Sequence, residues 1–112
     1  MQVGALLRHF RAGVERPFGM AMVGTVLAEE HHTPELFTQF RRRLVEPRRQ
    51  MLRAVLERAQ VRGELTDAAD LETAVNMLVG SYYANYLAGR IPRDWPQRTV
   101  DLILIGLRDD KE

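Results

Sequence analysis

The stretch Leu71 to Leu87, LETAVNMLVGSYYANYL, decides how the rest of the chain must fold. No residue from Thr73 to Gly89 carries a formal charge, so a helix formed here has no charged face for water. At helical spacing its bulky apolar residues fall on one side and its mostly small residues on another. The bulky set is Leu71, Val75, Leu78, Val79, Tyr82 and Tyr86, and the other set is Met77, Gly80, Ser81, Ala84 and Ala88.

This stretch predicts a buried helix of a soluble protein rather than a membrane span. A span needs ~20 apolar residues, whereas this one contains Asn76, Ser81, Asn85 and all 3 tyrosines of the chain. A helix that is apolar all round must be covered all round. The other helices of a chain of 112 residues can cover one side only. The small-residue side is therefore predicted to contact a second copy of the chain.

Length and composition predict one domain and exclude several kinds of site. A chain of 112 residues without cysteine can build one core and has neither disulfides nor thiolate metal sites. The first residues, MQVGALLRHF, lack the pattern of a signal peptide, so a cytoplasmic location is expected. The 16 basic and 15 acidic residues give a net charge of +1, which is too balanced for a domain that binds DNA by itself.

Apolar residues at helical spacing predict further helices around the central one, making an all-α bundle of about five helices. They are expected over residues 3–13, 18–32, 34–62 and 95–107. The first begins without an N-cap, which predicts that the natural chain extends upstream. In the second, Phe18, Met22, Val23, Val26 and Leu27 are expected to form a core stripe.

Helix ends and one interruption can also be placed. Pro47 falls inside the third helix and predicts either one kinked helix or two abutting ones. Gly63 is expected to end that helix in the left-handed conformation. Thr33 and Asp94 are expected to cap helix starts, with Gln97 completing a capping box behind Asp94. The central helix is expected to be capped by Asp67 or Asp70, of which Asp70 is the better cap because the uncharged stretch begins just after it.

Two groups of charged residues have a simple interpretation. Arginines at 41, 42, 43, 48, 49 and 53 could suggest nucleic acid, but interleaved glutamates favour a solvated helix face with intrahelical pairing. Glu29 and His32 have the spacing of a di-iron helix. That architecture needs a second such pair, which the sequence lacks, so no metal site is predicted.

Several features together resemble the C-terminal regulatory domain of TetR family transcriptional repressors. They are an arginine-rich helix with an internal proline, the segment Arg62-Gly63-Glu64-Leu65, then Asp70, Ala74, Gly80 and the pair Tyr82-Tyr83, followed by a short closing helix. The resemblance covers nearly the whole chain. It implies an apolar effector pocket, dimerisation through the last two helices, and DNA binding by an N-terminal helix-turn-helix domain that this chain lacks.

Two functions of different classes follow. The first is an effector-sensing, dimerising domain of a repressor. The alternative is a helical adaptor that binds another protein and has no small-molecule pocket. Residues expected to line a pocket for an apolar or amphipathic effector are Phe10, Met22, Val26, Phe40, Met51, Tyr82, Tyr83 and Asn76, and ordinary core packing is the competing interpretation of the apolar ones. No catalytic constellation and no cofactor motif is present, so the chain is not expected to be an enzyme.

The predicted homodimer has a seam between the last two helices of each copy. Pairing these helices across a two-fold axis makes a four-helix arrangement. The seam is expected to contain Met77, Gly80, Ser81, Ala84, Ala88, Leu102, Ile103 and Gly106.

Overall fold

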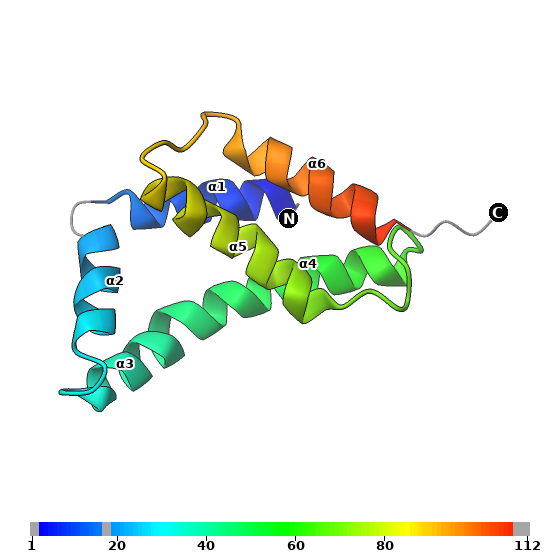
Figure 1. Ribbon diagram of the computed structural model, residues 1–112. Coiled ribbons are helices and arrows are strands. Elements are labelled where there is room, and N and C mark those ends of the chain that lie inside the picture. Colours follow the sequence, from blue (N-terminus) through cyan, green and yellow to red (C-terminus); the bar gives the residue numbers. More distant parts are fainter. Residues whose placement is uncertain (1–2, 17–18, 109–112) are drawn as a thin grey trace.

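The computed structural model describes residues 3–16 and 19–108, and the secondary-structure elements in these ranges are all helices. The elements are α1 (Val3–Val14), α2 (Gly19–Ala28), α3 (Pro34–Phe40), the π-helical segment η1 (Arg41–Val45), α4 (Glu46–Val61), α5 (Leu71–Leu87) and α6 (Trp95–Leu107). Because α3, η1 and α4 follow one another without a break, they form one long rod (Figure 1). The all-α bundle of about five helices is therefore confirmed.

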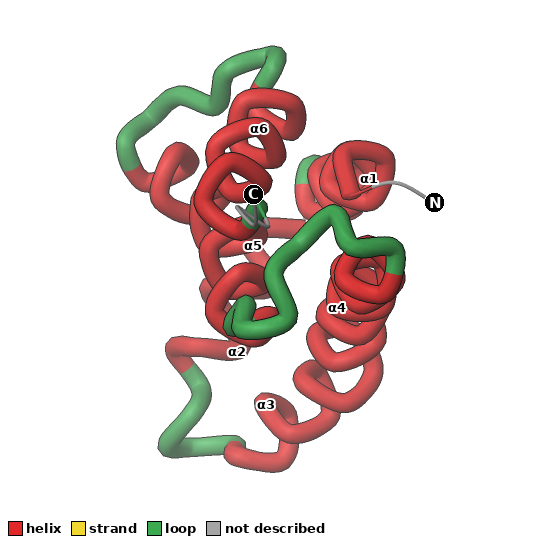
Figure 2. The backbone as a smooth tube through the Cα atoms, turned by 90° about the vertical axis from the view of Figure 1, so that its right-hand side faces the viewer, coloured by secondary structure: helices red, strands yellow, loops and turns green. Residues whose placement is uncertain are grey.

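Four of these helices surround one core. Figure 2 looks along the bundle and shows α1, α4, α5 and α6 around a common centre. In contrast, α2 comes close only to α1 and α3 among the described helices. It stands as an arm at the far end of the molecule, joined to the rod through α3 (Figure 1). The arm does not contact α4 or α5 closely.

The core contains all the residues that helical periodicity selects in α1 and most of those it selects in α5, where Val79 is only partly buried and Tyr86 is 47% exposed. All five stripe residues of α1 are buried, namely Val3, Leu6, Leu7, Phe10 and Val14. From α5, the bulky side contributes Leu71, Val75, Leu78 and Tyr82. Trp95, at the start of α6, is also buried, with its ring centroid 5.3 Å from that of Tyr82 and 6.3 Å from that of Phe10.

Pro47 is accommodated without breaking the rod. The residues around it keep right-handed helical dihedrals, and the amide of Glu46 donates to the carbonyl of Arg41, five residues earlier. This wider turn ends directly before the proline, which occupies the first turn of α4. Inside a continuous helix a proline removes one backbone hydrogen bond and crowds the carbonyl four residues before it, and the wider turn directly ahead of Pro47 relieves that crowding.

The predicted ends of the third and central helices are confirmed. Gly63 has φ +83°, and the amides of Gly63 and Glu64 donate to the carbonyls of Gln60 and Ala59, both at 3.0 Å. This is the Schellman pattern, for which glycine is favoured. At the start of α5, Asp70 accepts from the Thr73 amide at 3.1 Å and from the Thr73 hydroxyl at 2.6 Å.

Two predicted caps are wrong. The Thr33 side chain makes no capping bond, and its hydroxyl donates instead to Glu29 Oε1 at 3.4 Å. Asp94 likewise caps nothing with its side chain, and Gln97 donates to Asp101 at 2.6 Å. Thr33 has a competing partner four residues earlier in Glu29, and the Asp94 carboxylate has one four residues later in Arg98, whose guanidinium lies 3.9 Å away.

The stripe predicted for the second helix is wrong as a core stripe. Only Val26 is buried, while Met22 and Leu27 are 51% and 55% exposed. Phe18 lies outside the described residues. Because α2 stands away from the bundle, Met22 and Leu27 face hollows or solvent rather than a packed neighbour.

Candidate ligand-binding cavity

An apolar cavity of ≈ 700 Å³ lies between the α2 arm and the bundle. Its walls come from α1, α2, the α3–η1–α4 rod and α5, and its size is typical of small-molecule sites. The lining residues are Phe10, Met20, Val23, Gly24, Val26, Leu27, Phe37, Phe40, Arg41, Val45, Arg48, Arg49, Val79, Tyr83, Tyr86 and Leu87. Most of these side chains are aliphatic or aromatic, so the cavity favours an apolar body.

The position of α2 creates the cavity. This helix approaches α1 and α3 but neither α4 nor α5, so a space remains between the arm and the bundle. Gly24 faces that space, and a Cβ built on it would meet nothing within 4 Å. Leu87, on the opposite wall, is 84% exposed, and the cavity is therefore open to solvent at this rim.

Aromatic rings form the inner wall. The ring of Phe10 meets that of Tyr83 edge to face, at 6.0 Å and 86°, and Tyr83 meets Tyr82 in the same way at 6.1 Å. Burial raises the pKa of Tyr83, partly offset by the positive charge of Arg48. The Tyr83 phenol is therefore protonated at neutral pH and can donate a hydrogen bond into the cavity.

Three arginines are the charged lining residues of this cavity. The guanidinium of Arg41 lies over the Phe37 ring at 4.7 Å, and that of Arg48 lies over the Phe10 ring at 5.5 Å. Arg49 is placed differently, because it donates to Asn76 at 2.6 Å and to Glu72 at 3.0 Å.

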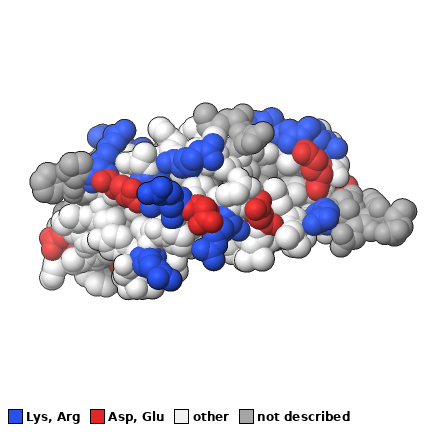
Figure 3. Space-filling model, turned by 90° about the horizontal axis from the view of Figure 1, so that it is seen from above, with Lys and Arg blue, Asp and Glu red and all other residues white. Residues whose placement is uncertain are grey.

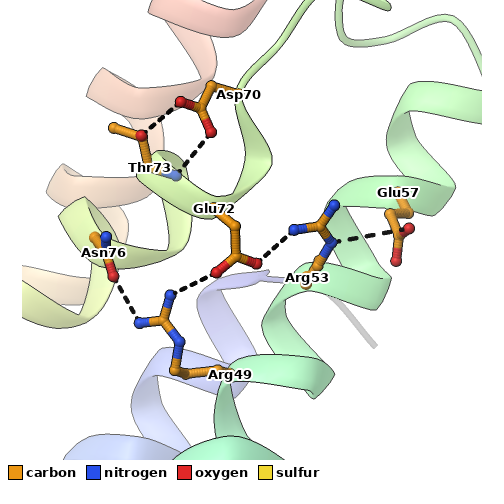
Figure 4. A network of polar contacts seen from close by, with 7 residues as sticks. All are labelled: Arg49, Arg53, Glu57, Asp70, Glu72, Thr73 and Asn76. Atoms are coloured by element: carbon orange, nitrogen blue, oxygen red, sulfur yellow. Dashed lines mark hydrogen bonds and ion pairs between the residues drawn. The ribbon is translucent and has the colours of Figure 1, made fainter.

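Glu72 is the centre of a polar network that fastens α4 to α5 (Figure 4). It accepts from Arg49 and also from Arg53, which in turn lies 4.0 Å from Glu57. These contacts lower the pKa of Glu72, with the hydrogen bond from Arg53 as the largest cause. A solvated helix face with intrahelical pairing was expected, and this is wrong for Arg49, whose side chain is only 24% exposed and pairs with Glu72 of another helix.

The predicted pocket residues divide into two groups. Phe10, Val26, Phe40 and Tyr83 line the cavity, and the other four lie elsewhere. Met22 lines a second hollow, of ≈ 750 Å³, between α2 and α3, and Met51 is an exposed residue of α4.

Tyr82 and Asn76 are also outside the cavity. Tyr82 is buried in the core, where its hydroxyl donates to Glu15 at 3.3 Å. Burial and the neighbouring Glu15 carboxylate raise the pKa of Tyr82 to about 12. Asn76 is exposed and accepts the hydrogen bond from Arg49. Periodicity selects the apolar positions of a helix, but it does not tell which neighbour a given position meets.

Lining residues that the sequence did not single out come mainly from α2 and the rod. They include Met20, Gly24, Phe37, Arg41 and Arg48. One signal was available, since Phe37 and Arg41 are four residues apart and so share a helix face. No such sequence signal points to Gly24, which lines the cavity because of the tilt of α2.

Most of the predicted seam lies on the surface of the single chain. Met77, Gly80, Ala84, Ala88, Leu102 and Gly106 are exposed, with Met77 at 54% and Leu102 at 71%. Ser81 is only partly exposed, and its hydroxyl accepts from the indole of Trp95 at 2.8 Å. Ile103 is buried in the core. An apolar surface therefore runs along α5 and α6. Beside it, Ser81 is hydrogen-bonded to Trp95 and Ile103 packs in the core.

Charge is mixed over the rest of the molecule. On the face that carries α6, acidic groups lie beside basic ones rather than in separate patches (Figure 3). Within residues 3–16 and 19–108, no three histidine or acidic side chains gather as metal ligands would. Among the same residues, no helix has both the length and the hydropathy to cross a membrane.

Comparison with known proteins gave one match. A family model described as Tetracyclin repressor-like, C-terminal domain, matches residues 3–103. This range includes every element that lines the cavity and most of α6. No curated protein and no solved structure matched the chain.

Proposed function

Because the chain belongs to the tetracyclin repressor-like C-terminal domain family, we propose that it senses an effector for a transcriptional repressor. The effector is an apolar or amphipathic small molecule that binds between α2 and the bundle. The observation that carries this proposal is the cavity of ≈ 700 Å³ with its aliphatic and aromatic walls. Sites of this size, with few polar groups, suit small organic ligands.

DNA binding is assigned to a separate N-terminal helix-turn-helix domain, as the family resemblance implies. Helix α1 is well placed to pass on the state of the cavity. Its Phe10 forms part of the cavity wall, and its Arg11 donates to the carbonyl of Pro92 at 2.9 Å, just before α6. A ligand that contacts Phe10 and shifts α1 would therefore also move Arg11 and its contact with the segment that leads into α6.

The proposed domain is also a homodimer. Exposed apolar residues of α5 and α6 support this, because a patch of this kind on a soluble protein marks an interaction surface. Two copies related by a two-fold axis would cover it on both chains at once. The adaptor function remains the second candidate, and it requires the same surface to accept a different protein.

Filling the cavity tests effector binding. We expect Gly24→Leu to occupy the space beside α2 without a clash, since nothing lies within 4 Å of a Cβ there. A thermal-shift screen of apolar and amphipathic compounds should find ligands for the wild type. Occupancy at 100 times the dissociation constant stabilises the fold by about 2.7 kcal/mol.

The same ligands should give no shift with Gly24→Leu. The matched control is Ala28→Leu, an exposed position of α2 that does not line the cavity. It should respond like the wild type. A broad screen without any shift in the wild type would favour the adaptor function.

A further inference from the structure

The cavity lining carries positive charge and no negative charge. Arg41, Arg48 and Arg49 are among its residues, and neither Asp nor Glu is. From this imbalance we propose that the effector is an amphipathic anion whose acidic head group binds Arg48. The inference rests on the proposed function and names the chemical class of the ligand.

Arg48 is the best placed of the three arginines. It is half-buried against the aromatic wall, with its guanidinium 5.5 Å from the centre of the Phe10 ring. It also lies close to α1, since a Cβ built on Gly13 would come within 2.9 Å of Arg48 Nη2. Its side chain makes no ion pair and donates no hydrogen bond to any residue in 3–16 or 19–108.

The other two arginines differ from Arg48 in ways that sharpen the assignment. Arg49 already has Glu72 and Asn76 as partners, so its charge is compensated within the protein. Arg41 is exposed and stacks on Phe37 at 4.7 Å, which places it at the solvent side of the cavity. A cation that is partly withdrawn from water and lacks a counter-ion favours an anionic ligand beside it.

The shape and chemistry of the cavity define the ligand further. A guanidinium presents parallel donors that match a carboxylate or a phosphate. The remaining walls, with Val26, Phe40 and Val79 among them, suit an alkyl or aromatic body. The expected ligand therefore joins an apolar body to one acidic group, either carboxylate or phosphate.

Four ten-carbon probes separate these possibilities: decanoate, decyl phosphate, decanol and decylamine. Isothermal titration of the wild-type chain should show at least one anion binding about 10-fold or more tightly than decanol, with decylamine weakest. The tighter of the two anions identifies the head group. If decanol or decylamine binds as tightly as both anions, the assignment of an anionic ligand is wrong, while the proposal of an apolar ligand-binding cavity is kept. If none of the four binds, the proposed function fails with it.

Substitution of Arg48 locates the head group. Arg48→Gln should weaken binding of the preferred anion by roughly 10- to 100-fold and leave decanol unchanged, because a charged hydrogen-bond partner is lost. Arg42→Gln is the matched control, since it removes the same charge from an exposed arginine outside the cavity. It should bind like the wild type.

Gly13→Ala provides a second variant that keeps the arginine. The added methyl group would meet only the tip of the Arg48 side chain, so the helix stays intact and the guanidinium must move. Anion affinity should fall by about 3-fold or more while decanol affinity is kept, since a displaced guanidinium no longer pairs well with the head group. Unchanged anion affinity in either folded variant would overturn the assignment to Arg48.

Discussion

The indole nitrogen of Trp95 donates a 2.8 Å hydrogen bond to the hydroxyl oxygen of Ser81, and so joins the start of α6 to the middle of α5. The same hydroxyl donates to the carbonyl of Leu78 at 2.8 Å. Trp95 is almost fully buried, so this contact satisfies a donor that has little access to water. Ser81 therefore orients the two helices of the proposed seam.

We expect Ser81→Ala to lower the free energy of unfolding by about 1–3 kcal/mol, because the buried indole N–H loses its partner. Urea denaturation measures the change. Repeating the substitution in a Trp95→Phe background isolates the bond, since any gain in helix propensity at position 81 cancels in the double-mutant cycle. In the Trp95→Phe background, Ser81→Ala should lower the free energy of unfolding clearly less than it does in the wild type. An equal cost in both backgrounds would show that the hydrogen bond contributes nothing.

Acid should destabilise the fold through Asp70 and Glu72. Hydrogen bonds from Thr73 lower the pKa of Asp70, and those from Arg53 and Arg49 lower the pKa of Glu72, from ordinary values of 3.8 and 4.5. A depressed pKa in the folded state stabilises the protein above the unfolded value. This stability is lost as the pH falls from about 4.5 toward the depressed pKa values.

The measurement is urea unfolding at a series of pH values from 7 to 3. Glu72→Gln should flatten the acid limb of this profile and lower stability at pH 7. Asp67→Asn is the control, since the Asp67 carboxylate makes no hydrogen bond or ion pair with a described residue. It should keep the wild-type profile. An unchanged acid limb in Glu72→Gln would contradict the prediction.

Ala84→Glu should convert the proposed dimer to monomer. Ala84 is exposed in the single chain, so the monomer tolerates the longer side chain. In a two-fold seam the defect occurs twice and buries unpaired charge, at a cost of several kcal/mol of association free energy. Light scattering gives the molar mass. Arg42→Glu, on an exposed part of η1, is the control and should stay dimeric. A dimeric Ala84→Glu protein would place the interface elsewhere.

The first glycine of α2 should not tolerate a side chain. A Cβ on Gly19 would lie 2.3 Å from the Val14 carbonyl oxygen, so Gly19→Ala forces the backbone of α1 and α2 apart. We expect a loss of about 1–3 kcal/mol. Gly24→Ala is the matched control within the same helix, because its Cβ meets nothing within 4 Å. It should be neutral or gain up to ~1 kcal/mol of helix propensity. Thermal unfolding that ranks the two variants equally would contradict this close approach.

Local chemistry was enough to predict much of the fold from the sequence. The stripe from Val3 to Val14, the Asp70 cap and the left-handed Gly63 depend on residues close together in the chain. Periodicity and backbone conformation are properties of such short segments. For the same reason the uncharged stretch from Thr73 to Gly89 predicted a buried helix with a second apolar side.

Tertiary structure alone decided the site. Met22 and Phe40 look alike in a helical pattern, yet Phe40 lines the cavity between α2 and the bundle whereas Met22 lines only the hollow between α2 and α3. Arg48 and Arg49 are neighbours in sequence, but Glu72 of α5 reaches only Arg49 of the two. Which apolar residue meets a cavity, and which cation keeps its charge uncompensated, depends on contacts between distant segments. Short-range periodicity carries no information about those contacts. They are set by how α2 and α5 pack against the rod, which only the tertiary structure shows.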